Sequence, residues 1–344
     1  GDVYGGGITL DFSANTNPLG TPPGVLEAVR RGLPQLHRYP APYCRRLVQA
    51  IATHEQVPAS YILCGNGAAD LIYAYCAALR PRTAVEPAPT FVEYGLGLAQ
   101  VGCCVTPYFL HQAENFDVDE GFLPFLEEKM PVAVFRCTPN NPTGRLLPLP
   151  LLEQVLQGCA AWGARVFLDE CFLDLTEDGV SARSLLAAHP ELLILKAFTK
   201  SYGMAGIRLG YCLCADSALL HRMASASQPW NVSSLAQSAG VAALTEQDFL
   251  QRTRSLVHTE RRWLTDNLTA LGFWVCPSQA NYLLFRGPRG LREGLLRQGI
   301  AIRGCENYSG LDDGWYRIAV RPHEENEALI TDIRQFCKEK SLWL

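Results

Sequence analysis

The chain has 344 residues, of which 48% are hydrophobic and 19% charged, and its formal net charge is −4. This composition is ordinary for a globular protein, and the length favours one large domain with a smaller one beside it. Because there is no basic excess and no block rich in lysine and arginine, we expect no nucleic-acid partner. No apolar run is long enough to span a membrane, and the start GDVYGGGITLDF lacks the parts of a signal peptide, so we expect a cytoplasmic protein.

The cysteine and histidine residues indicate neither a disulfide framework nor a metal site. The 13 cysteines are odd in number, scattered and without a CxxC pair, which favours reduced core residues over a disulfide framework. The seven histidines show no HExxH or similar spacing, so no metal site is expected.

Between residues 60 and 215, short apolar runs alternate with amphipathic helical patterns. Runs that are continuously apolar are typical of strands covered on both faces, and strand–helix repetition predicts a mostly parallel sheet. A helix is expected over 150–163, and the predicted strands are YILCG (61–65), TAVEPAP (83–89), VAVFRCTP (132–139), RVFLDE (165–170), LLILKAF (192–198) and RLGYCLC (208–214).

The last hundred residues have a different pattern, which predicts an α+β unit. Its elements are a helix over 246–271, a strand at 280–287, a helix at 290–298, strands at 300–304 and 315–321, and a final helix from 323. The first 25 residues, rich in glycine and proline, are expected to pack beside this unit. We therefore predict an α/β fold in which helices sandwich the sheet of a large domain (26–240), with a small domain formed by 1–25 and 241–344.

Three polar residues lie where such a sheet binds its ligands, at the carboxyl ends of strands, and an arginine follows at the start of the next strand. Asp169 ends RVFLD, Asn141 lies in the turn PNNPTG, Lys200 follows LKAFT, and Arg208 comes eight residues later. A lysine for a Schiff base, a carboxylate for a protonated ring nitrogen, an amide for a phenolic oxygen and an arginine for a phosphate form the set that binds pyridoxal phosphate. The alternatives are a helix N-cap for Asp169, an exposed loop position for Lys200 and an ordinary ion pair for Arg208.

Other residues are suited to the same ligand or to its substrate. In GNGAAD, the backbone amides of Gly67 and Ala68 precede a helical run, where a phosphate can bind, and the third glycine of a dinucleotide fingerprint is missing. Phe91 offers either a core ring or a flat surface for the pyridine ring. Arg303 and Arg321 each close an apolar strand, and each suits either a substrate carboxylate or phosphate or an interdomain ion pair.

With these motifs the chain resembles the aspartate-aminotransferase superfamily, the fold type I pyridoxal-phosphate enzymes, over essentially its whole length. QPWNVSSLAQ and RGCENYSGLDDGWYRIAVR resemble the threonine-phosphate decarboxylases of cobalamin biosynthesis, and the histidinol-phosphate aminotransferases come next. Phe172 in DECF, where many aminotransferases have a tyrosine, favours the decarboxylases. The resemblance implies decarboxylation of threonine phosphate to aminopropanol phosphate. The alternatives are an aminotransferase acting on histidinol phosphate or another amino acid, and a non-catalytic protein that kept the fold.

The resemblance also implies roles for single residues. Thr199 is expected at the cofactor phosphate, because Ala197 replaces the serine or threonine that the family usually has three residues before the lysine. Asn17 in DFSANTNPLG, and Tyr4 in place of the histidine of an HGG segment, are expected at the substrate. Tyr39, the tyrosine of RYP, is expected to reach the cofactor phosphate of a second subunit, which implies a homodimer with a shared active site.

Overall fold

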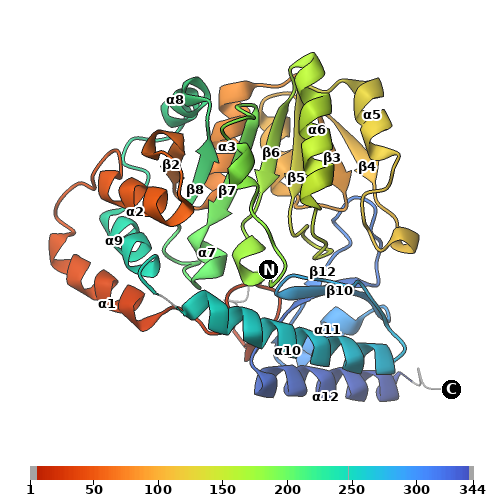
Figure 1. Ribbon diagram of the computed structural model, residues 1–344. Helices are drawn as coiled ribbons and strands as arrows, with labels where there is room; N and C mark the ends of the chain where they lie inside the picture. The colour runs from red at the N-terminus through yellow and green to blue at the C-terminus, as the bar shows by residue number, and fades with distance from the viewer. Residues whose placement is uncertain (1–5, 247, 341–344) are drawn as a thin grey trace.

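The large unit of the chain is built on a seven-stranded sheet (Figure 1). The computed structural model describes residues 6–246 and 248–340. The strand order is β2-β8-β7-β6-β5-β3-β4; β8 is antiparallel to both of its neighbours, and the other pairs are parallel. The predicted mostly parallel sheet is therefore confirmed. The strands are β2 (Ile62–Gly65), β3 (Thr83–Ala88), β4 (Cys104–Phe109), β5 (Ala133–Cys137), β6 (Arg165–Asp169), β7 (Leu192–Ala197) and β8 (Gly210–Cys214).

Helices cover both faces of this sheet, as its continuously apolar strands require. In β5, Val134 packs into the core on one face, and Phe135 packs into the core on the other. The first face is covered by α1 (Pro23–Gly32), α2 (Arg45–Glu55), α5 (Phe122–Lys129), α6 (Leu149–Trp162) and α9 (Ser234–Ala243). The second is covered by α3 (Ala68–Leu79), α4 (Glu93–Gln100) and α8 (Ser217–Ala226).

The smaller unit lies below the large sheet in Figure 1, where α10 and α12 run side by side. Its four-stranded sheet has the order β12-β13-β10-β9. The N-terminal segment joins this unit, because β1 pairs with β11 and Phe12 is buried in its core. The elements are β1 (Leu10–Asp11), α10 (Phe249–Ala270), β9 (Trp274–Val275), β10 (Tyr282–Arg286), α11 (Leu291–Arg297), β11 (Ile300–Ala301), β12 (Arg303–Gly304), β13 (Trp315–Ala319) and α12 (His323–Glu339).

Short helical turns complete the chain. They are η1 (Leu33–Gln35), η2 (Ala59–Tyr61), η3 (Gln112–Glu114), η4 (Leu173–Leu175), η5 (Ala182–Leu185) and α7 (Phe198–Ser201). All 13 cysteines are free thiols, and most of them are buried.

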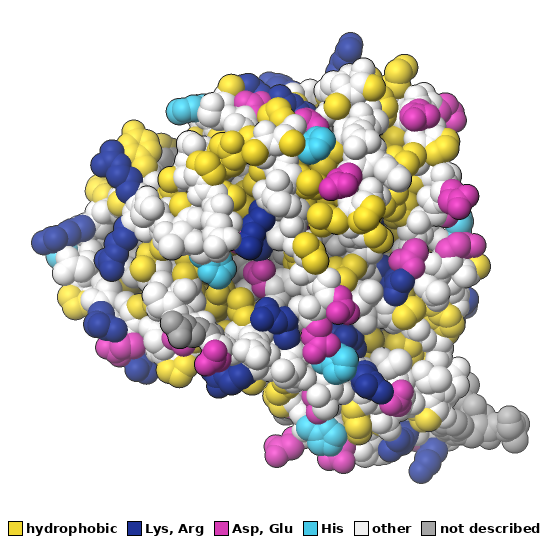
Figure 2. Space-filling view, viewed as in Figure 1, with side chains coloured by type: hydrophobic (Ala, Val, Ile, Leu, Met, Phe, Trp, Pro, Cys, Tyr) yellow, Lys and Arg dark blue, Asp and Glu magenta, His cyan; other side chains and the backbone are white. Residues whose placement is uncertain are grey.

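The predicted strands and helices are present, with ends that differ by at most three residues from those observed, except that the predicted strand 300–304 is split into β11 and β12, which belong to different sheets. The strand β4 was not predicted; it lies at the edge of the sheet and contains Pro107, which breaks the usual strand pattern. The helix α1 packs on α9 of the large unit, whereas the segment before it packs on the small one. None of the described helices has the length and apolar character of a membrane span. On the face shown in Figure 2, acidic and basic side chains are interspersed.

Candidate active site

A cavity of about 270 Å³ lies at the carboxyl ends of the central strands, between the two units. It collects most of the residues that the sequence singled out, although long stretches of chain separate them. The large unit contributes Asp169, Lys200, Asn141, Arg208, Ala68, Phe91 and Thr199, and the small unit and N-terminal segment contribute Ser13, Asn15 and Arg317.

Asp169 is a buried carboxylate at the end of β6. Its Oδ2 accepts a hydrogen bond of 2.6 Å from the Tyr94 hydroxyl, and its Oδ1 accepts one of 2.8 Å from the Cys171 backbone N–H. Burial raises the pKa of Asp169 even though these bonds and the charge of Lys200 act in the opposite direction. A cationic group placed in the cavity, such as a protonated ring nitrogen, would compensate this carboxylate.

Lys200 is held in the short helix α7, directly after β7, and its side chain lines the cavity. Burial, followed by the nearby charge of Arg317, lowers the pKa of Lys200 to about 8. A lysine with such a pKa has an appreciable neutral fraction near neutral pH, and only the neutral amine is a nucleophile. The Nζ atom lies 5.5 Å from the centroid of the Phe172 ring.

The start of α3 and Arg208 form a cradle for an anion. Gly67 precedes the helix with φ +84°, and a Cβ at this position would lie 2.6 Å from the Arg208 Nη2 atom. A Cβ at Gly210 would lie 2.7 Å from the backbone N of Ala68. Glycine is therefore needed at both positions, and the close approach brings the guanidinium of Arg208 to the free N–H groups of the helix start. This donor set fits a phosphate group.

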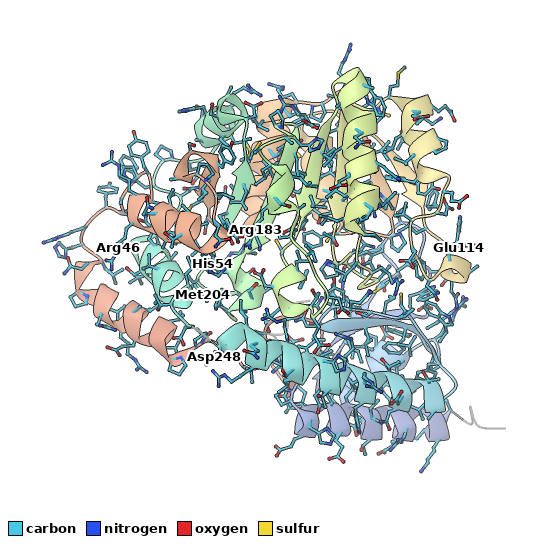
Figure 3. The ribbon with its side chains drawn as sticks, viewed as in Figure 1. Arg46, His54, Glu114, Arg183, Met204 and Asp248 are labelled. Carbon is cyan, nitrogen blue, oxygen red and sulfur yellow. The ribbon has the colours of Figure 1, made fainter. Side chains whose placement is uncertain are left out.

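A largely buried network of ionic side chains supports the short helix α7 through its residue Ser201. The Ser201 hydroxyl donates to Asp174 Oδ2 over 3.0 Å, and Lys196 Nζ donates to Asp174 Oδ1 over 3.0 Å. Lys196 also lies 3.2 Å from Glu55 Oε1, and Arg183, which Figure 3 shows beside the end of α2, donates to Glu55 Oε2 over 3.1 Å. This network was not predictable from the sequence, because Lys196 lies inside an otherwise apolar strand.

Two residues of the cavity were missed from the sequence. Arg317, on β13, donates to Asn141 Oδ1 over 2.6 Å and to the Ser13 carbonyl over 2.7 Å, while its Nε has no partner in the described structure. Asn15 is 2% exposed, and neither atom of its side-chain amide has a hydrogen-bond partner among residues 6–246 and 248–340. Because buried polar groups are normally satisfied, these atoms mark where a polar ligand would bind.

The orientation of Arg317 could have been predicted from the alternation of core-facing and outward-facing side chains along β13. Tyr316 and Ile318 face the core of the small unit, so the residue between them must face the other way, towards the cavity. Arg303, which was predicted at the substrate, pairs with Arg317 in the neighbouring strand but does not line the cavity, and its Nη2 donates to Asn307 Oδ1 over 2.8 Å.

Four other selected residues are placed outside the cavity lining or outside the described residues. Arg321 donates from its Nε to Glu325 Oε2 over 2.9 Å on the first turn of α12. Asn17 is buried beneath the site, where its amide donates to the Ser201 carbonyl over 2.7 Å. Tyr39 is 82% exposed and packs on Trp230, with 5.0 Å between the ring centroids. Tyr4 lies outside the described residues.

Comparison with known proteins agrees with this geometry. The family model for aminotransferase class I and II matches residues 8–333. A threonine-phosphate decarboxylase of Salmonella typhimurium is 39% identical over 94% of this chain and 90% of its own length. A histidinol-phosphate aminotransferase of Nitratidesulfovibrio vulgaris (strain Hildenborough) is 34% identical over 98% of this chain and 90% of its own. The crystal structure of the histidinol-phosphate aminotransferase from Clostridium acetobutylicum superposes with a TM-score of 0.89, at 27% identity, over 96% of this chain and 99% of that one. The chain therefore belongs to the class I and II aminotransferase family, and it is an enzyme whose cofactor is pyridoxal phosphate.

Proposed function

We propose that the chain is a cytoplasmic, pyridoxal-phosphate-dependent decarboxylase of an O-phosphorylated β-hydroxy amino acid. The observation that carries this proposal is a pair of polar groups without partners in the described structure, the Arg317 Nε and the Asn15 side-chain amide, in the same cavity as Lys200. The 39% identity to a threonine-phosphate decarboxylase supports threonine phosphate as substrate and aminopropanol phosphate as product. This reaction would place the chain in cobalamin biosynthesis.

The residues of the cavity divide between cofactor and substrate. Asp169 would hold the ring nitrogen, Asn141 the phenolic oxygen, Phe91 the ring face, and Arg208 the phosphate, together with the amide of Ala68. Thr199 lies in the same wall and would add a hydroxyl to the phosphate contacts. When bound through Lys200, the cofactor supplies an electron-withdrawing ring that allows a bond to the substrate Cα to break.

Arg317 and its neighbours would decide which bond breaks, because the bond that stands perpendicular to the ring plane is the one that is weakened. Two hydrogen bonds, to Asn141 and to the Ser13 carbonyl, fix the guanidinium before substrate binds. Such prior positioning is worth several kcal/mol in an oriented reaction. With one anionic group of the substrate on Arg317 and Asn15, and Arg303 on the strand beside Arg317 for a second, the carboxylate would be turned to the perpendicular position. Lys200, with its pKa lowered to about 8, is the group suited to return a proton to Cα.

We further propose a homodimer in which Tyr39 completes the partner's site. Tyr39, Tyr43, Leu36 and Trp230 are large apolar side chains that are about half or more exposed, and an exposed apolar patch of this kind marks an interface. Sedimentation of the purified protein would show a dimer, and a Tyr39→Ala variant would keep the dimer while losing affinity for the cofactor.

The decisive experiment incubates the cofactor-loaded protein with threonine phosphate and follows carbon dioxide and the cofactor absorbance together. Carbon dioxide release, with the original absorbance band returning as substrate is consumed, is the expected result. The second candidate is an aminotransferase, which the 34% identity to a histidinol-phosphate aminotransferase favours. Absence of carbon dioxide, with conversion to the pyridoxamine form on adding glutamate or histidinol phosphate, would establish that activity instead.

A further inference from the structure

A second cavity, of about 630 Å³, lies on the other side of β5 from the active site. The two cavities share no lining residue. Arg136 lines the second cavity and Cys137 the first, because successive residues of a strand point to opposite faces. The turn that follows divides in the same way, since Asn140 faces the second cavity and Asn141 the active site.

Arg136 is an unusual residue for the centre of a sheet. Its side chain is 5% exposed, and within the described part of the chain its Nε and Nη1 atoms have no hydrogen-bond partner. Its guanidinium lies 5.2 Å from the centroid of the Phe122 ring, a weak contact for a full charge. Burial lowers the pKa of Arg136 to about 10, which still leaves the group charged near neutral pH. A buried charge without a partner strongly opposes folding. An anion that enters the cavity and pairs with Arg136 would therefore stabilise the folded protein.

The other charges of this cavity do not compensate Arg136. Arg145 and Asp117 form a two-pronged pair, with 2.7 Å between Nε and Oδ1, and Arg145 Nη1 also donates to the Pro277 carbonyl over 2.6 Å. These two charges therefore neutralise each other. Asp178 is an exposed residue of the lining, beside the exposed Val180.

The remaining walls suit a ligand with a polar and an apolar part. Thr138 Oγ1 accepts a hydrogen bond of 3.0 Å from the Leu147 backbone N–H, which leaves its O–H free to donate to an anion. The apolar surface comes from Leu110, Leu147, Leu149, Leu151, Leu173 and Val180.

We propose that this cavity is a binding site for a small organic anion, separate from the active site. The charged group, a carboxylate or a phosphate monoester, pairs with Arg136 and accepts from Thr138, and the apolar remainder contacts the leucine wall. Two N–H donors of one guanidinium match the geometry of either anion.

The test measures thermal unfolding of the cofactor-loaded enzyme with phenyl phosphate, valerate, inorganic phosphate or sodium chloride at equal ionic strength. We expect phenyl phosphate or valerate to raise the melting temperature by about 2 °C at ten times the dissociation constant, relative to chloride. A response to phenyl phosphate alone identifies a phosphate ester, and a response to valerate alone identifies a carboxylate. No response, or a response to inorganic phosphate only, would overturn the proposal.

Substitutions identify the site at which the anion binds when it raises the melting temperature. Arg136→Met should abolish it and should melt higher than the wild type in chloride, because it removes an uncompensated buried charge. Arg317→Met, which removes the anion site of the catalytic cavity, should retain the response. Val180→Trp leaves Arg136 in place but fills part of the cavity, and it should also abolish the response, which keeps the test valid if Arg136→Met does not fold. A full response in Arg136→Met would assign the anion to another site and refute the inference.

Discussion

Tyr94→Phe should weaken cofactor binding at pH values below the pKa of Asp169 without changing the packing around that residue. Tyr94 is fully buried, and its hydroxyl donates to Asp169 Oδ2 over 2.6 Å. The substitution removes this donor and keeps the ring that packs against Phe135 and Phe167. Asp169 then keeps the Cys171 N–H bond at Oδ1. Because burial already raises the pKa of Asp169, loss of a hydrogen bond to its charged form raises that pKa further.

The magnitude follows from the strength of a hydrogen bond to a charged group. Such a bond is worth about 1.5–3 kcal/mol, and about 1.4 kcal/mol corresponds to a factor of ten. Only ionised Asp169 pairs with a protonated ring nitrogen. Well above its pKa the variant and the wild type should therefore bind the cofactor equally, whereas below it the variant should bind about 10- to 100-fold more weakly. The acidic limb of the affinity profile should move to higher pH.

The assay is a titration of the cofactor-free protein with pyridoxal phosphate, followed by absorbance from about pH 5 to about pH 8. Tyr75→Phe is the matched control. Tyr75 packs against the same two phenylalanines, but its buried hydroxyl has no hydrogen-bond partner in the described structure. We expect wild-type affinity for it at every pH. Identical profiles for Tyr94→Phe and the wild type would refute the role of Tyr94, and equal weakening in both variants would assign the effect to packing.

Four further substitutions test other parts of the structure. Burial raises the pKa of Glu86 to about 7, so the wild type should lose stability as pH rises from about 4.5 to 7. Glu86→Gln should therefore be about 3 kcal/mol more stable than the wild type at pH 8 in urea unfolding. Lys196→Met should destabilise the protein by about 3–5 kcal/mol in the same assay, because it removes the cation that Glu55 and Asp174 share and leaves Glu55 with Arg183 alone. Arg317→Lys should lower kcat/KM by about 100-fold in the decarboxylation assay, since a lysine cannot make the same pair of bonds, whereas Arg321→Lys should change it by less than about twofold.

Much of the fold was predictable because the strands of the large sheet are buried on both faces. A segment such as LLILKA must be covered by helices on each side, and Asp169, Asn141 and Lys200 follow strands that lie side by side in a parallel arrangement. Their convergence in one cavity is a consequence of that arrangement, so the order of the motifs along the chain was enough to predict it.

The side of the cavity that the small unit and the N-terminal segment form was harder to predict, because it depends on the path of the backbone rather than on sequence motifs. Asn15 and Asn17 stand two residues apart in DFSANTNPLG, but only Asn15 lines the cavity, while Asn17 supports the chain beneath α7. The distinction depends on the path of the N-terminal segment after it leaves β1. Arg317 and Arg321 differ in the same way, since the strand ends at Ala319 and the next turn directs Arg321 to Glu325.

The charges of the cavity also couple substrate binding to the proton affinity of Lys200. Burial lowers the pKa of Lys200 to about 8, and the charge of Arg317 is the second largest cause. A substrate anion on Arg317 would neutralise that charge, so the amine released from the cofactor would then be a stronger base than in the absence of substrate. Lys200 would thus be a good nucleophile before the anion arrives and a better proton carrier afterwards. One arginine would therefore serve both steps, because its charge lowers the pKa of the lysine and its guanidinium would contact the substrate.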